Sequence, residues 1–305
     1  MFDSTDPRSQ LTPSAPASVG TDDIATPETL VLADADNADS STPGAKSWEA
    51  RGENFRVRYV ELAAGAELEW NENRGYVLIV EATGGADNTA VSVQAGTDSV
   101  VLDERGIIVV PGGTSRITTT SAVVVIAVID TVGAASTVAM NEESYAQAHP
   151  RVTKLPADSP SIDVLKAYPL SDFPAEEGRF GTIFRTGTLM INFLDEQEGP
   201  RDTEKLSPHH HDDFEQGSLT ISGTWRHHIR TPWTTKMSQW RDDVHTSVEG
   251  PSLTIIPPPT VHTSRAVGDG VNLMIDLFSP PRMDFAEKGW VVNAGDFPLD
   301  EENCS

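Results

Sequence analysis

From about residue 50 onward, short runs of apolar or alternating residues recur along the chain, separated by Gly, Asn and Asp. These runs are rich in Val, Ile and Thr, which suit the pleated surface of a sheet, and helical periodicity is weak. The pattern predicts two series of strands, joined by an irregular, proline-containing stretch with one possible short helix near residues 141–148. The predicted strands of the first series are residues 55–62, 75–81, 90–94, 107–110 and 122–129. Those of the second series are residues 187–193, 217–222, 224–230, 252–256 and 271–278.

The two series of predicted strands match each other in order and spacing. Residues 73–80 align with residues 215–222 at the same strand phase, and residues 111–116 align with residues 257–262. The sequence identity is modest, but the intervals between the aligned segments are similar. We interpret this match as an internal repeat of one β unit.

Histidines concentrate in the second series, where seven of the eight lie between residues 209 and 262. On a strand, alternate residues point to the same side, so His209 and His211 can reach one ion together. Glu215 adds a carboxylate, and His262 adds a third imidazole from a distant strand. Three imidazoles and one carboxylate suit Fe, Mn, Ni, Co or Zn and leave positions open for a substrate. The spacing therefore predicts a divalent metal site formed by these four residues.

With these residues at this spacing, segment 209–215 resembles the first motif of the cupin superfamily. Segment 257–262 resembles the second motif, with Pro259 where the family usually has Gly. The Gly that usually follows the first motif is approximated by Gly223, one residue later than the common spacing. The resemblance implies an all-β bicupin made of two double-stranded β-helix barrels of jelly-roll type, each enclosing an interior that can hold a ligand.

On this basis we expect four segments along the chain. They are a disordered acidic tail over residues 1–45, a degenerate cupin barrel over residues 46–132, a connector over residues 133–172, and a metal-binding cupin barrel with a C-terminal strap over residues 173–305. The tail is predicted to be disordered because its scatter of Asp, Ser, Thr, Pro and Ala buries too little apolar surface to offset the ordering entropy. It also lacks the basic and apolar regions of a secretory signal.

The first copy of the repeat has lost the metal-binding residues. No histidine precedes His149, and Glu67, Glu69, Asn73 and Arg116 take the places of the four predicted ligands. We expect this barrel to have a structural role, and we conjecture that an ion pair between Arg116 and a glutamate fills the old site.

One predicted strand of the second series, residues 224–230, is unusually polar for a barrel. Alternation puts Trp225 and His227 on one face and three basic residues on the other. If the basic face lines the cavity, it could hold a carboxylate or enolate beside the metal ion; if the other face does, the pocket is more aromatic. The candidate catalytic residues are Arg226, His228 and Arg230, with His245 as a possible general acid or base.

The net charge of −24 disfavours nucleic acid and anionic membranes as partners. No run of about 18 apolar residues exists that could span a membrane. The single cysteine, Cys304, excludes an intrachain disulfide and fits a cytoplasmic location. We expect a small-molecule substrate as partner, and a homo-oligomer because cupins often associate through their outer sheets.

The resemblance implies a metal-dependent enzyme, most simply a non-haem iron dioxygenase acting on a small organic substrate that chelates the metal, because this chemistry is common among metal-binding cupins. The expected cofactor is a divalent ion, with Fe(II) preferred and Mn, Ni or Zn open. Two alternatives remain. The first is a non-redox isomerase, lyase or decarboxylase that uses the ion as a Lewis acid. The second is a non-catalytic protein that binds a sugar or an organic acid.

Overall fold

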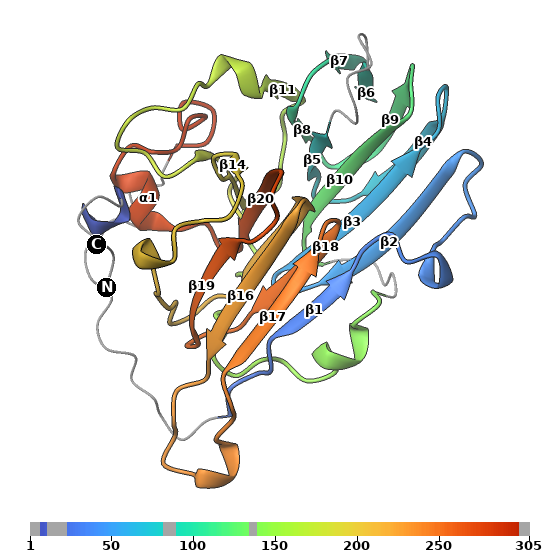
Figure 1. The fold of residues 1–305 in the computed structure, drawn as a ribbon. Helices are drawn as coiled ribbons and strands as arrows, with labels where there is room; N and C mark the ends of the chain where they lie inside the picture. The colour runs from blue at the N-terminus through green and yellow to red at the C-terminus, as the bar shows by residue number, and fades with distance from the viewer. Residues whose placement is uncertain (1–6, 11–22, 82–89, 134–138, 299–305) are drawn as a thin grey trace.

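The computed structural model describes residues 7–10, 23–81, 90–133 and 139–298. Within these ranges the chain forms four sheets of antiparallel strands (Figure 1), which confirms the predicted all-β fold. The helical elements described are α1 (Met283–Glu287) and the 3-10 turns η1 (Pro7–Gln10), η2 (Ala35–Asn37), η3 (Glu142–Tyr145), η4 (Leu170–Asp172), η5 (Thr203–Lys205) and η6 (Met237–Gln239). Among the described helices, none has the length and apolar character needed to cross a membrane.

Two large sheets share one strand order. The first sheet, in the order β11-β8-β5-β10-β3-β2, contains β2 (Ala45–Arg51), β3 (Phe55–Leu62), β5 (Tyr76–Glu81), β8 (Gly106–Val110), β10 (Val123–Asp130) and β11 (Lys166–Pro169). The second, in the order β1-β18-β15-β20-β13-β12, contains β1 (Glu28–Val31), β12 (Thr182–Arg185), β13 (Met190–Phe193), β15 (Gln216–Ser222), β18 (Ser252–Ile256) and β20 (Val271–Phe278), and the short β14 (Gln197–Glu198) also pairs with β20. Apart from β14, the strands of the two sheets correspond one to one, as an internal repeat requires.

A smaller sheet packs on each large one. The first contains β4 (Glu67–Glu72), β6 (Val91–Ala95), β7 (Asp98–Leu102) and β9 (Gly113–Thr119). The second contains β16 (Thr224–Arg230), β17 (Val244–Glu249) and β19 (Val261–Ala266). In the first barrel, Leu78 of β5, Val93 of β6 and Ile117 of β9 belong to one buried apolar cluster that joins the two sheets. In the second barrel, the corresponding contact is made by Trp225 of β16 and Met274 of β20.

The two large sheets pack against each other through a shared core. It includes Val77 and Ile79 of β5, Leu219 of β15, and Ile275 and Leu277 of β20. Strands of these sheets are therefore buried on both faces, and all six residues of β5 are buried. Two stacked sheets with both faces covered explain why these strands appear in the sequence as continuous apolar runs rather than alternating ones.

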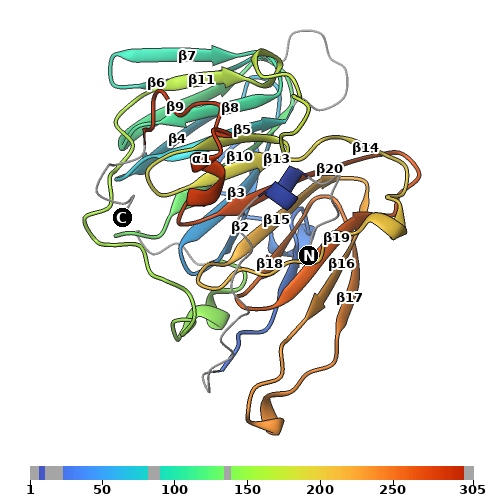
Figure 2. The same ribbon diagram turned by 90° about the vertical axis from the view of Figure 1, so that its left-hand side faces the viewer.

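The barrels exchange edge strands. β1 lies within the predicted tail, yet it pairs with β18 of the second barrel, and Leu32 after it is fully buried in the shared core. β11 lies in the predicted connector and pairs with β8 of the first barrel (Figures 1 and 2). The expectation of disorder thus does not hold for residues 23–45, because a few apolar residues are enough when they complete an existing sheet edge. Residues 1–6 and 11–22 of the predicted tail lie outside the described residues.

The conjectured ion pair in the first barrel forms at the surface. Arg116 Nη2 lies 3.2 Å from Glu67 Oε1, and both side chains are about half exposed. Between the two sheets of this barrel the residues are apolar instead, and Leu68 and Val91 belong to the same buried cluster as Ile117. The pair therefore does not fill an interior site as we conjectured.

Candidate metal centre

Three of the predicted ligands meet inside the second barrel. His209 and His211 precede β15, and His262 lies on β19; their ligand nitrogens are all within 4.8 Å of one another. Two backbone hydrogen bonds between His209 and His262, of 3.0 and 2.8 Å, hold the two segments together. The predicted grouping of the three imidazoles is therefore present in the structure.

The imidazoles are held in the form that binds a metal. Nδ1 of His209 donates to the carbonyl oxygen of Ser207 at 2.9 Å, and Nδ1 of His262 donates to that of Thr260 at 3.1 Å. Because a carbonyl oxygen can only accept, the proton of each ring is on Nδ1, and Nε2 carries the lone pair that a metal ion can bind. Burial lowers the pKa of His209 well below its usual value and that of His262 to about 4, so both rings are neutral near pH 7.

A fourth donor comes from Gln216, the first residue of β15. Its Oε1 lies 3.0 Å from Nε2 of His211 and 3.2 Å from Nε2 of His262. Its Nε2 donates to Oδ1 of Asp276 at 3.0 Å and to Oγ of Ser218 at 2.9 Å. These two hydrogen bonds fix the orientation of the amide, so that its oxygen faces the histidines.

This donor set fits a divalent cation. Nε2 of His262 and Oε1 of Gln216 face each other 3.2 Å apart, and both are hydrogen-bond acceptors in the tautomer described above. Two buried acceptors in contact are unfavourable without a proton or cation between them, and burial disfavours protonation of His262. Three imidazole nitrogens and one amide oxygen are neutral donors that Mn, Fe, Ni or Zn can accept.

The structure does not bring Glu215 to the imidazoles. Its Oε2 accepts from the backbone N–H of Glu53 at 2.6 Å, and its Oε1 accepts from Nδ1 of His149 at 2.5 Å and from the hydroxyl of Tyr145 at 3.3 Å. These partners precede the second barrel in the sequence, and consecutive residues of extended chain point to opposite sides, so only Gln216 faces the cavity. Burial would lower the pKa of His149, but its hydrogen bond with Glu215 and the charge of that carboxylate give a net increase.

The sequence held a signal for Gln216. Counted from Glu215, Gly223 falls one residue later than the spacing common in cupins; counted from Gln216, the offset disappears. Position 223 requires a glycine, because φ there is +76° and a Cβ would lie 2.3 Å from Oδ1 of Asn272.

The four predicted catalytic residues lie away from the imidazoles. Their strands form the small sheet of the second barrel, and the alternation of burial along β16 puts Trp225 and His227 inside. Arg230 forms an exposed ion pair with Asp243. The side chains on the outer face are Arg226, His228, Arg230 and, on β17, His245, whose Nδ1 lies 2.8 Å from Nδ1 of His228. The prediction therefore chose the wrong face of this strand, and the aromatic alternative is the one that lines the interior.

Two buried titratable groups lie near the centre. His227 is fully buried; its Nδ1 bonds Oγ of Ser264 at 2.7 Å, and burial lowers its pKa to about 4. Its Nε2 has no hydrogen-bond partner among the described residues. Burial raises the pKa of Asp276 to about 6, against the lowering effect of its hydrogen bond from Ser218. Both groups are therefore poised to be neutral at mildly acidic pH.

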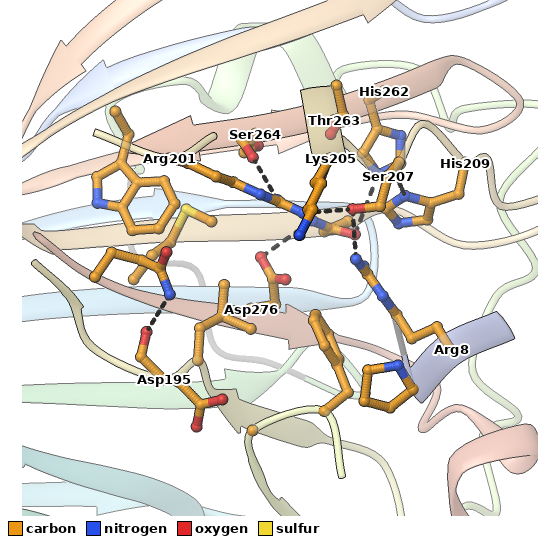
Figure 3. A pocket seen from close by; sticks show the side chains of 18 of the residues that line it. Arg8, Asp195, Arg201, Lys205, Ser207, His209, His262, Thr263, Ser264 and Asp276 are labelled. Carbon is orange, nitrogen blue, oxygen red and sulfur yellow. Dashed lines mark hydrogen bonds between the residues drawn. The ribbon is translucent and has the colours of Figure 1, made fainter. Parts of the chain in front are cut away.

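A cavity of about 490 Å³ opens onto the site (Figure 3). His209, Gln216 and His262 form one part of its wall, and Trp225 and Met274 form an apolar part. The charged residues that line it are Arg8, Arg179, Arg201, Lys205, Asp195, Asp202 and Asp276. Four cations against three acids, in a chain with a net charge of −24, make this cavity locally more positive than the molecule as a whole.

Comparison with known proteins gives the same fold. No protein-family model matches the sequence, and no curated protein matches it significantly. Oxalate decarboxylase from Lactobacillus farciminis, in a formate complex, has a TM-score of 0.58 and 12% identity, covering 88% of this chain and 90% of that chain. Oxalate decarboxylase from Bacillus subtilis, studied for its Mn(II) centres, has a TM-score of 0.55 and 12% identity, with coverages of 87% and 80%. AerE from Microcystis aeruginosa has a TM-score of 0.54 and 9% identity, with coverages of 82% and 98%.

These similarities, together with the duplicated strand order, show that the chain has a two-barrel bicupin fold, as the two motifs predicted. At identities of 9% and 12% the similarity concerns the fold, and the chemistry must be argued from the residues of the site.

Proposed function

We propose that this protein is a metal-dependent enzyme that acts on a small anionic organic acid by non-redox chemistry, as an isomerase, lyase or decarboxylase does. The observation that carries the proposal is the neutral donor set, three imidazoles and the amide oxygen of Gln216, at the wall of a cavity rich in cations. Neutral donors leave the full double charge of a divalent ion available to a bound anion.

A bound ion would polarise a carboxylate or carbonyl oxygen of the substrate as a Lewis acid. The protein's own residues have distinct tasks around it. Asp276 and Ser218 hold the amide of Gln216, while Trp225 and Met274 limit the size of what enters. The cations of the cavity attract the anion despite the acidic surface of the molecule.

The donor set also weighs against the iron dioxygenase that the sequence predicted. Non-haem iron oxygenases commonly use two histidines and one carboxylate, and the carboxylate expected here, Glu215, bonds His149 instead. Oxalate decarboxylase, which shares the fold, is named for the removal of CO₂ from a small dicarboxylate. This name supports a small organic acid as the substrate class and decarboxylation as one candidate reaction.

The test uses protein purified without an affinity tag, stripped of metal and reloaded separately with Mn(II), Zn(II), Ni(II) or Fe(II). A panel of small 2-oxo and dicarboxylic acids is followed by proton NMR and by an oxygen electrode. We expect conversion of at least one acid under anaerobic conditions, lost in His262→Ala and retained in the surface variant Arg230→Gln.

Two results would contradict the proposal. Conversion that requires oxygen, with oxygen consumed in proportion to substrate, would establish the iron dioxygenase instead. Tight binding of an acid without conversion by any metal form would identify a binding protein.

A further inference from the structure

The inner face of β16 places an indole ring in the wall of the metal cavity. Trp225 is 3% exposed and lines the cavity together with Met274 of β20. Its cross-strand neighbours are Val248 of β17 and Ala266 of β19. All four residues belong to one buried apolar cluster. Close packing in this cluster fixes the position of the indole before any ligand arrives.

The N–H group of this indole is buried without a hydrogen-bond partner among the described residues. The side chains that pack on the ring are aliphatic or, in Met274, a thioether, so they offer no oxygen acceptor. A buried indole N–H usually has a partner, because leaving it unbonded is unfavourable. A phenyl ring would fill most of the same space without this penalty. The N–H of Trp225 is therefore suited to donate to an oxygen of a ligand in the cavity.

Trp225 lies far from the metal centre along the small sheet. On β19, His262 is paired with Ile229 of β16, whereas Ala266 is paired with Trp225. Four residues of a strand span about 13 Å. A ligand that reaches both the ion and the indole therefore carries its second polar group several bonds away from the group that coordinates the ion.

The charge beside the indole favours a neutral oxygen at this end of the cavity. Leu194 packs against the cluster that contains Trp225, and the next residue, Asp195, lines the cavity. Figure 3 shows Asp195 well apart from His209 and His262. Burial raises the pKa of Asp195, with no opposing contribution from a nearby cation. A second carboxylate of a ligand would be repelled by this acid, whereas a hydroxyl or carbonyl oxygen can accept from the indole without that repulsion.

We infer that the indole N–H of Trp225 binds a neutral oxygen of the substrate, such as a hydroxyl, at the end of the cavity opposite the histidines. The inference rests on the proposed function and specifies it further. The substrate is an acid whose carboxylate engages the metal ion and whose hydroxyl or carbonyl oxygen lies several carbons away. Trp225 determines specificity for that oxygen.

The test compares three acids of equal chain length, 6-hydroxyhexanoate, hexanoate and adipate, by calorimetry on the Zn(II)-loaded protein. The wild type is expected to bind 6-hydroxyhexanoate most tightly, because only this acid brings a neutral oxygen to the indole. Trp225→Phe keeps an aromatic ring and removes the N–H. It should weaken binding of 6-hydroxyhexanoate about fivefold and binding of hexanoate less than about twofold.

The matched control is Trp240→Phe. It also removes an indole N–H, but this one donates to the backbone carbonyl oxygen of Thr234 at 2.9 Å, and neither residue lines the cavity. This variant should change neither affinity.

The indole signal gives a second, direct readout. In a proton–nitrogen NMR spectrum, the signal of Trp225 is the one that Trp225→Phe lacks. Its proton should move downfield when 6-hydroxyhexanoate is added, and should not move with hexanoate. A hydrogen bond to the added hydroxyl accounts for this difference, since the two acids otherwise share the same chain.

Equal affinity of the wild type and Trp225→Phe for 6-hydroxyhexanoate would overturn the inference. An equal loss for both monocarboxylates would do so too, because it indicates a packing role for the ring, and so would tighter binding of adipate than of 6-hydroxyhexanoate. If zinc does not bind the wild type, the proposed function fails, and the NMR titration of the metal-free protein still decides the role of Trp225. A downfield shift with 6-hydroxyhexanoate then supports it, and an unmoved signal overturns it.

Discussion

At the scale of single residues, the second barrel keeps several histidines neutral by burying them. His227 is an example, because it is fully buried and burial lowers its pKa to about 4. An unfolded chain takes up a proton on this ring below about pH 6.5, whereas the folded chain does not until near pH 4. As the pH falls from about 6.5 to 4, the neutral state of buried His227 therefore lowers the free energy of unfolding.

The variant His227→Asn should weaken the pH dependence of stability. Between pH 7 and pH 5 the free energy of unfolding should fall by about 2 kcal/mol less in the variant than in the wild type, since this proton uptake is removed. Urea denaturation at the two pH values measures the difference. Equal pH dependence in the two proteins would show that His227 is not neutral when folded.

The sequence pattern predicted the three imidazoles correctly. For the fourth ligand it indicated Glu215, whereas the residue that faces the histidines is its neighbour, Gln216. Alternation on a strand places His209 and His211 correctly, whereas the irregular segment before β15 leaves the phase of Glu215 and Gln216 open. Glu215 is the residue type that a metal usually prefers, and only the position of Gly223 argued for Gln216. The buried partner of Glu215, His149, could not be identified from the sequence because contacts over such separations have no local signal.

At the scale of elements, β16 separates two environments. Its inner face presents Trp225 and His227 to the barrel. On its outer face, Arg230 forms an ion pair with Asp243. Outside, the contacts of His228 and His245 join β16 to β17 without reaching the cavity.

Removal of the outer histidines should leave the site intact. His228→Ala and His245→Ala are expected to retain wild-type metal content and turnover, because their side chains contact each other at the surface. Trp225→Ala, on the inner face, should raise the KM for the substrate by removing an apolar wall of the cavity. Metal analysis and steady-state kinetics compare the three variants, and loss of turnover in His228→Ala would restore the predicted catalytic role.

The bounds of long apolar strands could be predicted from the sequence, but which face of a strand is buried could not always be. β3, β16 and β18 begin and end where the apolar pattern predicted. Short strands such as β1 and β14 were missed because two to four residues at a sheet edge have no periodicity of their own. The polar outer face of β16 resembled a binding surface because the sequence does not say which side of a strand meets water.

At the scale of the whole molecule, the barrels are joined by a shared core and by exchanged strands. β1 extends the second barrel's large sheet, and β11 extends the first barrel's. The repeat was visible in the sequence, but the exchange was not, because strand partners across a duplicated sheet depend on packing rather than on local pattern. The predicted homo-oligomer stays a prediction, which light scattering can test.

The ordered position of β1 can be tested with two adjacent residues. Leu32 is fully buried in the shared core and Val31 is 59% exposed. Leu32→Ala should lower the free energy of unfolding by about 3 kcal/mol through lost packing, and Val31→Ala should leave it nearly unchanged. Chemical denaturation measures both. Equal stability of Leu32→Ala and the wild type would indicate that this segment is a disordered tail after all.

The most direct test of the account is the metal content of four proteins, measured by mass spectrometry after untagged purification and dialysis. We predict near-stoichiometric metal in the wild type and in Glu215→Gln, and none in His262→Ala. Gln216→Leu should bind metal about ten- to a hundredfold more weakly, because it lacks the oxygen that Asp276 and Ser218 hold toward the histidines. Metal lost in Glu215→Gln but retained in Gln216→Leu would contradict the centre described here.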